Sequence, residues 1–349
     1  MTKTNAGNFF EDFKVGQVLT HATPRTVSEG DRALYQALFG SRFSLQSSDE
    51  VGRKAGYPQS PIDDLLAFHI VFGKTVPDVS LNAVANLGYA DCRFHRPVFP
   101  GDTLSTISKV IGLKENSDGA TGVVYVRSTG RNQKDEIVID YVRWVMVRKR
   151  DKTSPAPQTE VPTLGAVVDP KSLFAPLGVS FKGFDTVASG SPHLWDDYEV
   201  GEKIDHVDGV TIEEAEHMMA TRLYQNTAKV HFNQFTEGQG RFGRRLIYGG
   251  HVISLARALS FNGLGNAMLV AAINGGRHVA PCFAGNTIFA WSEVLDKASL
   301  EGRDDVGALR LRTIATKDLP CANFPGALEK GYAEGVILDL DYWVLMPRR

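Results

Sequence analysis

Two stretches of the chain are apolar on most faces, and each predicts a helix buried in the protein interior. They are residues 62–72 and residues 251–261. A helix at the surface would instead show one apolar stripe and one polar face. The sequence therefore predicts two central helices, one in each half of the chain.

A shorter helix is expected before each central helix. Residues 28–31 (SEGD) can cap a helix over 32–39. Residues 211–214 (TIEE) have the form of a capping box, which predicts a helix over 215–224.

Runs of β-branched and aromatic residues follow the central helices and predict strands. They lie at 123–126, 137–139, 141–147 and 336–338. A buried helix followed by consecutive antiparallel strands predicts an α+β fold in which a sheet wraps around the helix.

The same order of segments occurs twice, so the chain is predicted to be a duplication. Residues 10–16 (FEDFKVG) return as residues 195–201 (WDDYEVG), an offset of 185. Residues 139–145 (IDYVRWV) return as 338–344 (LDLDYWV). Ordered matches with a slowly drifting offset indicate two copies of one supersecondary unit. Positions where the copies differ are then the places to look for chemistry.

A Pro- and Ser-rich connector separates the two copies and suggests the domain boundaries. We predict an N-terminal unit over 1–150, a linker over 151–192 and a C-terminal unit over 193–349. A chain of 349 residues suits two units of roughly 150 residues each.

Composition narrows the class of protein. The net charge of −2 gives no reason to expect nucleic acid or an anionic membrane as a partner. The N-terminus has no secretory signal pattern, and the three cysteines share no motif spacing, so we expect reduced thiols in a cytoplasmic protein. We find no phosphate-binding loop, no dinucleotide fingerprint and no zinc-ligand spacing, and expect neither a metal nor a separate cofactor.

The arrangement resembles the MaoC-like (R)-specific enoyl-CoA hydratases in their double hotdog form. That family has a Gly-Asp-x-Asn-Pro-Leu-His segment, matched here by 225–231 (QNTAKVH), and a Gly-containing turn at the central helix, matched by 247–251 (IYGGH). The first copy has 40–46 (GSRFSLQ) and 62–66 (IDDLL) at these places. Residues 93–104 resemble the family's Pro-Val-x-x-Gly-Asp turn. The resemblance implies a double hotdog fold acting on an acyl-CoA thioester.

Residues 7–13, 68–78 and 143–150 resemble one branch of that family more closely, and this resemblance implies a substrate. It implies reversible hydration of mesaconyl-C1-CoA to (2R,3S)-β-methylmalyl-CoA in the ethylmalonyl-CoA pathway, with CoA as part of the substrate and a homo-oligomer, preferably a dimer. The family's Asp is Asn226 here, its Asn is Ala228 and its Pro is Lys229. A neutral amide thus stands where the family has a carboxylate, which leaves the general acid unassigned.

The difference between the copies suggests that the second one is catalytic. Hydration of an unsaturated thioester needs a base for water, an acid for the α carbon and donors for the thioester oxygen. His231 can move protons near neutral pH, whereas its counterpart Gln46 cannot. Gly250, where the first copy has Leu65, lets a carbonyl approach its backbone N–H. We therefore predict His231 as acid/base, Asn226 as a holder of water or hydroxyl, and Gly250 as the oxyanion donor.

Further residues are candidates for binding the substrate. Tyr248 and Gly249 adjoin the catalytic turn. A free carboxylate on the substrate would call for a cation, and the candidates are Arg222, Lys229 and Arg42. Each of the three is also explained, and more commonly, as a solvated surface charge.

Two pairs of histidines occupy equivalent places in both copies. They are His21 with His206 and His95 with His278. Because the degenerate copy keeps its member of each pair, we interpret all four as structural.

Other functions fit the same residues. A hotdog thioesterase would release free CoA, and a hydratase for straight-chain (R)-enoyl-CoA would turn over crotonyl-CoA equally well. A non-catalytic acyl-CoA binding protein is the third alternative, and Asn226 in place of a carboxylate keeps it open.

Overall fold

The computed structural model describes residues 3–176 and 178–349, and its main feature is one antiparallel sheet of 11 strands. The order along the sheet is β1-β3-β4-β5-β2-β8-β11-β10-β9-β6, with β7 paired to β9. The two copies join at the centre, where β2 and β8 pair through Tyr89 opposite Gly276 and Arg93 opposite Ala272. The strands are β1 (Val18–Thr26), β2 (Ala83–Phe94), β3 (Thr103–Glu115), β4 (Thr121–Arg131), β5 (Ile137–Arg148), β6 (Lys203–Asp205), β7 (Val210–Thr211), β8 (Leu269–His278), β9 (Thr287–Ser299), β10 (Val306–Lys317) and β11 (Val336–Pro347).

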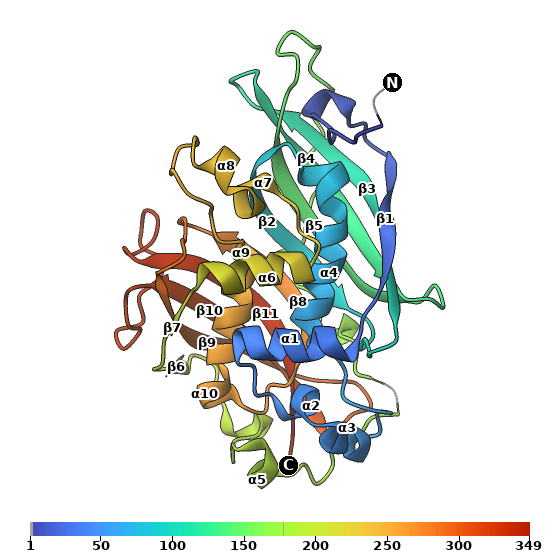
Figure 1. The fold of residues 1–349 in the computed structure, drawn as a ribbon. Helices are drawn as coiled ribbons and strands as arrows, with labels where there is room; N and C mark the ends of the chain where they lie inside the picture. Colours follow the sequence, from blue (N-terminus) through green and yellow to red (C-terminus); the bar gives the residue numbers. More distant parts are fainter. Residues whose placement is uncertain (1–2, 177) are drawn as a thin grey trace.

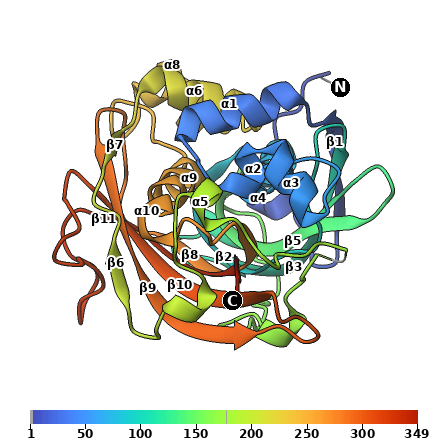
Figure 2. The same cartoon turned by 90° about the horizontal axis from the view of Figure 1, so that it is seen from below.

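The sheet curves around one long helix from each copy, α4 (Asp64–Thr75) and α9 (Gly249–Leu259), as Figures 1 and 2 show. Every residue of α4 after Asp64 is buried. Helices α1 (Glu29–Phe39) and α6 (Glu214–Leu223) contact each other over the side of the central helices that the sheet leaves uncovered. The remaining helices are α2 (Ser44–Ser47), α3 (Asp49–Ala55), α5 (Thr186–Ser189), α7 (Lys229–Phe232), α8 (Gln234–Glu237) and α10 (Phe261–Leu264).

These elements confirm the predicted α+β arrangement, in which each copy has a buried helix and an antiparallel sheet. The predicted cap at Ser28 is also confirmed, because its side chain accepts a hydrogen bond from the backbone N–H of Asp31. The capping box at 211–214 is wrong. Thr211 belongs to β7, where its hydroxyl bonds that of Thr287 at 2.8 Å, and α6 starts after Glu213 with no side-chain cap.

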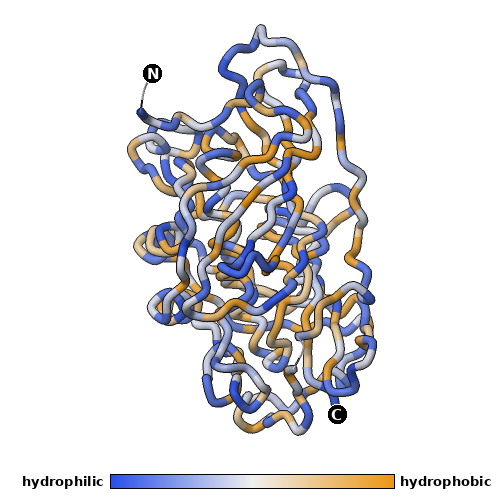
Figure 3. The backbone as a smooth tube through the Cα atoms, turned by 90° about the vertical axis from the view of Figure 1, so that its right-hand side faces the viewer, coloured by the Kyte–Doolittle hydropathy of each residue, from blue (hydrophilic) through white to orange (hydrophobic). Residues whose placement is uncertain are grey.

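The apolar core is shared by the two copies. One cluster of buried side chains contains Phe68 and Phe72 of α4 together with Val252 and Ile253 of α9. Figure 3 shows apolar stretches running through both halves of the molecule. The linker also packs, since Phe181 is buried in a second cluster beside β8 and β11. Burial of this shared surface provides the main free energy that holds the copies together.

No helix among the described residues has the length and apolarity that a membrane span requires. The three cysteines, Cys92, Cys282 and Cys321, are free thiols and all are buried.

Candidate active site

The segment that carries His231 leaves α6 through a tight turn and lies on the central helix of the other copy. Gln225 adopts φ 55°, the left-handed conformation that Gly40 adopts at the same place in the first copy. For a non-glycine residue this conformation costs about 1–2 kcal/mol. Gly73 of α4 lies directly beneath the turn, where an added Cβ would overlap the carbonyl oxygen of Tyr224. Copy two therefore supplies the segment that carries His231, and this segment packs on the central helix of copy one.

His231 has one ring nitrogen bound, and the other has no hydrogen-bond partner among residues 3–176 and 178–349. Its Nδ1 lies 2.9 Å from the carbonyl oxygen of Leu246, and a carbonyl can only accept, so Nδ1 carries the proton. The Nε2 lone pair is then available to a ligand. The side chain is half-buried, whereas its counterpart Gln46 is fully buried and donates to the carbonyl of Met268 at 2.7 Å. His231 is thus the member of the pair that a substrate can reach.

The N-terminus of α9 lies beside this imidazole. Its N-cap residue, Tyr248, makes no side-chain cap, so the positive end of the helix is open at Gly249 and Gly250. The Tyr248 ring lies 5.5 Å from that of His231. A Cβ on Gly250 would come within 2.5 Å of the ring of His69. Both glycines are therefore needed for close packing around an open helix end.

Five histidines gather at this helix end, although the sequence predicted a role for only one. Burial lowers the pKa of His217 to about 2, of His69 and His251 to about 3, and of His231 and His278 to about 4. All five imidazoles are therefore neutral at pH 7 and can act as bases or hydrogen-bonding groups. Among the described residues they form no group suited to holding a metal ion.

Two members of this cluster hold the site together. His217 Nε2 accepts a hydrogen bond from the backbone N–H of Tyr248 at 2.9 Å. His69 lies between Tyr248 and Ser254, with ring nitrogens 3.3 Å from the Tyr248 hydroxyl and 2.9 Å from the Ser254 hydroxyl. These bonds fix Tyr248 at the junction of the copies.

The side chain of Asn226 is buried and makes one hydrogen bond within its own segment. Its Oδ1 accepts a hydrogen bond from the backbone N–H of Ala228 at 3.2 Å. This is the turn-forming bond common for asparagine. The Nδ2 amide is left as the donor that a ligand could use.

The three predicted carboxylate-binding cations differ in their surroundings. Arg222 and Lys229 are exposed. Arg42 lies over the ring of Phe261, 4.7 Å from its centroid, beyond the opposite end of an 11-residue helix about 16 Å long. Arg245 lies near the histidines, and its charge contributes to lowering the pKa of His217 after burial and two neighbouring imidazoles. Arg245 already lies 3.5 Å from the carboxylate of Glu214.

The equivalent place in copy one is closed by its own side chains. Asp63 stands where copy two has Tyr248, and its carboxylate accepts from the N–H of Leu65 at 2.9 Å. Leu65 is the counterpart of Gly250, so the N–H that is open in copy two is capped here. Beside Asp64 there is a cavity of about 20 Å³, room for about one water molecule. This geometry favours copy two as the catalytic half.

The closed site predicts a pH-dependent stability. Burial raises the pKa of Asp64 to about 8, with a further contribution from Asp63. Because the folded pKa is raised, the contribution of Asp64 to stability is present below about pH 4 and is lost as pH rises toward 8. We expect Asp64→Asn to raise the free energy of unfolding at pH 8 by about 1–3 kcal/mol, at roughly 1.4 kcal/mol per pKa unit with allowance for relaxation. Denaturant unfolding at pH 5 and pH 8 measures this, and a gain no larger at pH 8 would contradict it.

His278 differs from its counterpart in copy one, contrary to the interpretation of both as structural. His95 Nε2 lies 2.6 Å from the carboxylate of Asp140. The corresponding Asp339 is engaged by Arg312 and by the Tyr332 hydroxyl at 2.7 Å. His278 instead lies against Gly249, where an added Cβ would overlap its ring, and its buried Nε2 has no partner in the described structure. It is a second imidazole directed at the open helix end.

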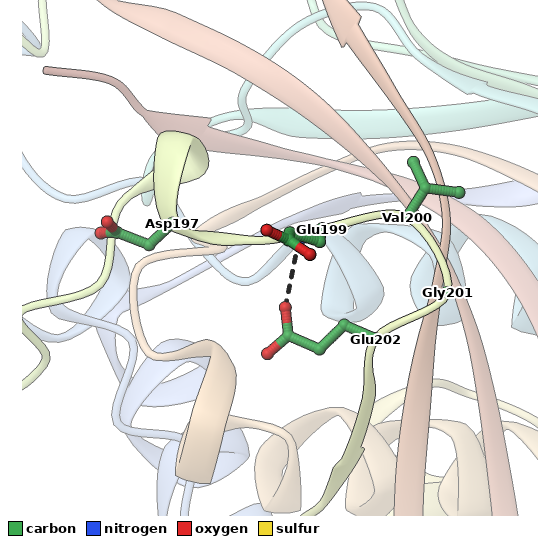
Figure 4. Close-up of a pocket in the computed structure, with 5 residues that line it drawn as sticks. All are labelled: Asp197, Glu199, Val200, Gly201 and Glu202. Carbon is green, nitrogen blue, oxygen red and sulfur yellow. Dashed lines mark hydrogen bonds between the residues drawn. The ribbon is translucent and has the colours of Figure 1, made fainter.

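A surface depression elsewhere contains none of these residues. It has a volume of about 570 Å³ and is lined by Asp197, Glu199, Val200, Gly201 and Glu202, whose side chains Figure 4 shows. The N–H of Glu199 donates to the carboxylate of Glu202 at 3.1 Å. Its carboxylates would repel the phosphates of CoA.

Solved structures with the same architecture define the class of protein. A MaoC domain protein dehydratase from Chloroflexus aurantiacus superimposes with a TM-score of 0.98 at 64% identity, covering 100% of both chains. A Mycobacterium tuberculosis protein described as a double hotdog fold has a TM-score of 0.71 at 24% identity, covering 98% of this chain and 99% of that one. The chain is therefore a MaoC-like double hotdog protein, as predicted.

Sequence comparison narrows the class to one family. A family model described as mesaconyl-CoA hydratase matches residues 1–325. A β-methylmalyl-CoA dehydratase from C. aurantiacus is 65% identical over 99% of both chains. A mesaconyl-CoA hydratase from Cereibacter sphaeroides is 61% identical over 99% of this chain and 100% of its own. The chain belongs to the mesaconyl-CoA hydratase family.

Proposed function

We propose that the protein is a hydro-lyase that adds water reversibly to mesaconyl-C1-CoA, giving (2R,3S)-β-methylmalyl-CoA. Relatives at 65% and 61% identity, one named as a dehydratase and one as a hydratase, support this substrate. The observation that carries the chemistry is the half-buried imidazole of His231, whose Nε2 has no partner in the described part of the chain and which lies next to the N-terminus of α9, where Tyr248 makes no side-chain cap.

The proposed reaction uses His231 as the base. Its neutral Nε2 takes a proton from water while the water oxygen bonds to the β carbon of the substrate. The electron pair of the double bond moves to the α carbon and the thioester oxygen, which the backbone N–H of Gly250 holds at the positive helix end. A proton added to the α carbon completes the hydration. The thioester itself acidifies that carbon, so the only cofactor needed is the CoA of the substrate.

We propose His278 as the second proton-transfer group, in the role that Asn226 cannot fill. An amide has no proton to exchange near neutral pH, whereas a neutral imidazole can both give and accept one. Asn226 would then orient the water or the product hydroxyl through its Nδ2.

Replacement of His278 by glutamine is expected to lower kcat for hydration and dehydration by about 10–100-fold, with KM nearly unchanged. His95→Gln is the matched control, because His95 is its counterpart in the closed copy and pairs with Asp140. Steady-state kinetics with thermal melting of both variants makes the comparison. Equal kinetic losses in both variants would contradict the assignment of His278.

The function itself is tested with the unmodified protein and mesaconyl-C1-CoA. We expect loss of the enoyl thioester absorbance and gain of one water in the product mass, without release of CoA thiol. Thiol release would identify a thioesterase instead. Equal turnover of crotonyl-CoA would identify a straight-chain hydratase, and binding without turnover a non-catalytic protein.

A further inference from the structure

A buried arginine that the proposed reaction has not used lies in copy one. Arg143, in the middle of β5, is 0% exposed. Its Nη2 donates to the hydroxyls of Thr75 at 2.8 Å and Ser80 at 3.4 Å. Its Nε and Nη1 have no hydrogen-bond partner. The guanidinium lies over the ring of Phe72, 4.2 Å from the centroid.

The charge of Arg143 is not balanced by a carboxylate of the protein. Across residues 3–176 and 178–349, its hydrogen-bond acceptors are the two hydroxyls, and no ion pair includes it. A buried cation without a counter-charge is strongly unfavourable. Thr75 is the last residue of α4, and the negative end of that helix offsets part of the charge. The helix end leaves the donors at Nε and Nη1 unmatched.

The closed site shows what completes such an arrangement. In copy two, Arg257 of α9 is the counterpart of Phe72, and Tyr342 of β11 is the counterpart of Arg143. The arginine therefore lies on the central helix in copy two and on a strand in copy one. Burial lowers the pKa of Arg257, and Tyr342, Asp63 and Asp64 oppose that shift. Both Nη groups of Arg257 have an acceptor, the Ser260 hydroxyl at 3.1 Å and the carbonyl of Ala267. In the open site, Nε and Nη1 of Arg143 have no acceptor among the described residues.

Arg143 lies close to the proposed reaction centre. The ring of Phe72 is 5.5 Å from that of Tyr248, and the Tyr248 ring is 5.5 Å from that of His231. Tyr248 also packs on Gly250. In mesaconyl-C1-CoA two carbons separate the thioester carbonyl carbon from the free carboxylate carbon, and this trans skeleton spans roughly 3.8 Å, like a trans peptide unit. A thioester at Gly250 would thus direct the carboxylate toward the wall formed by Tyr248, Phe72 and Arg143.

We propose that Arg143 binds the free carboxylate of the substrate through one of its two unpartnered donors, Nε or Nη1, and selects for a four-carbon acyl chain that ends in a carboxylate. This inference rests on the proposed function. A charge-assisted hydrogen bond from a guanidinium N–H to a carboxylate is stronger than one to a neutral acceptor. The substrate would supply both the acceptor and the counter-charge that Arg143 lacks among the described residues. Specificity would then come from copy one and proton transfer from copy two.

The test compares two substrates that differ only in the carboxylate. Mesaconyl-C1-CoA is paired with (E)-2-methylbut-2-enoyl-CoA, in which a methyl group replaces it. We expect Arg143→Met to lower kcat/KM for mesaconyl-C1-CoA at least 100-fold while changing that for the methyl analogue less than threefold. Arg143→Lys should restore part of the loss, and Arg245→Met, the control at another cation near the histidines, should retain the wild-type preference. An arginine that only stabilised the end of α4 would lower both activities equally, and that result would overturn the proposal.

A binding measurement on the wild-type protein keeps the proposal testable if the variants do not fold or mesaconyl-C1-CoA is not turned over. Succinyl-CoA and butyryl-CoA have the same chain length and differ in the terminal carboxylate. We expect succinyl-CoA to bind at least 10-fold more tightly by titration calorimetry. Equal affinities would overturn the carboxylate site. If the protein binds succinyl-CoA more tightly than butyryl-CoA but does not hydrate mesaconyl-C1-CoA, the proposed function alone would be overturned.

Discussion

Replacement of His231 by glutamine is expected to lower kcat/KM for hydration of mesaconyl-C1-CoA by about a thousandfold or more. General acid–base groups contribute about 10²–10⁴-fold to a rate, and glutamine cannot take a proton from water. Glutamine is the informative choice, because copy one has Gln46 at the same position in the same local fold. The variant should therefore fold and bind acyl-CoA. Steady-state kinetics measures the loss of activity, thermal melting measures folding, and titration with a CoA ester measures binding.

The pH dependence of the wild-type protein gives an independent check on His231. Burial lowers its pKa to about 4, opposed by the hydrogen bond to Leu246. A base must be neutral to act, so kcat/KM should be constant from about pH 6 to 8 and should fall as pH drops toward 4. His193 is exposed, so His193→Gln serves as the control for a histidine-to-glutamine substitution and should leave kcat/KM unchanged. Full activity in His231→Gln, or a kcat/KM that falls already below pH 7, would contradict the assignment.

Comparison of the two copies predicted much of this site because their differences are local. His231 stands out against Gln46, and Gly250 against Leu65. The same comparison would have identified His69, whose counterpart is Ser254, and Arg143, whose counterpart is Tyr342. Both were missed because the resemblance directed attention to the 225–231 segment and its turn, whereas both residues lie in copy one. The central helices and strands followed from apolar patterns that the fold preserves.

His278 could not be found in that way, because both copies have a histidine there. What differs is the partner. Asp140 accepts from Arg127 and His95, whereas Asp339 accepts from Arg312 and, in place of the histidine, from the Tyr332 hydroxyl. Tyr332 lies in the long segment between β10 and β11, and only folding brings this segment close to Asp339. A hydrogen-bond partner exchanged between distant segments leaves no local pattern in the sequence.

Replacement of Gly250 by alanine is the second large effect that we expect. The added methyl group would come within 2.5 Å of the His69 ring and would overlap the Tyr248 ring. These rings are buried on all sides, so the backbone of α9 must shift, and with it the N–H proposed to hold the thioester oxygen. Loss of one such donor lowers kcat by about 10²–10³-fold. Gly30→Ala is the control, since a Cβ there meets only the Ser28 hydroxyl at 3.5 Å, so that its activity should be unchanged.

The kinetic pattern in Gly250→Ala separates oxyanion stabilisation from simple crowding. An interaction made only as charge develops on the thioester oxygen would lower kcat and kcat/KM together and leave the affinity for succinyl-CoA unchanged. Crowding alone would weaken binding of every acyl-CoA and leave kcat near the wild-type value. The second pattern would remove Gly250 from the mechanism while leaving His231 in place. The open end of α9 would then serve only to seat Tyr248 between the two copies.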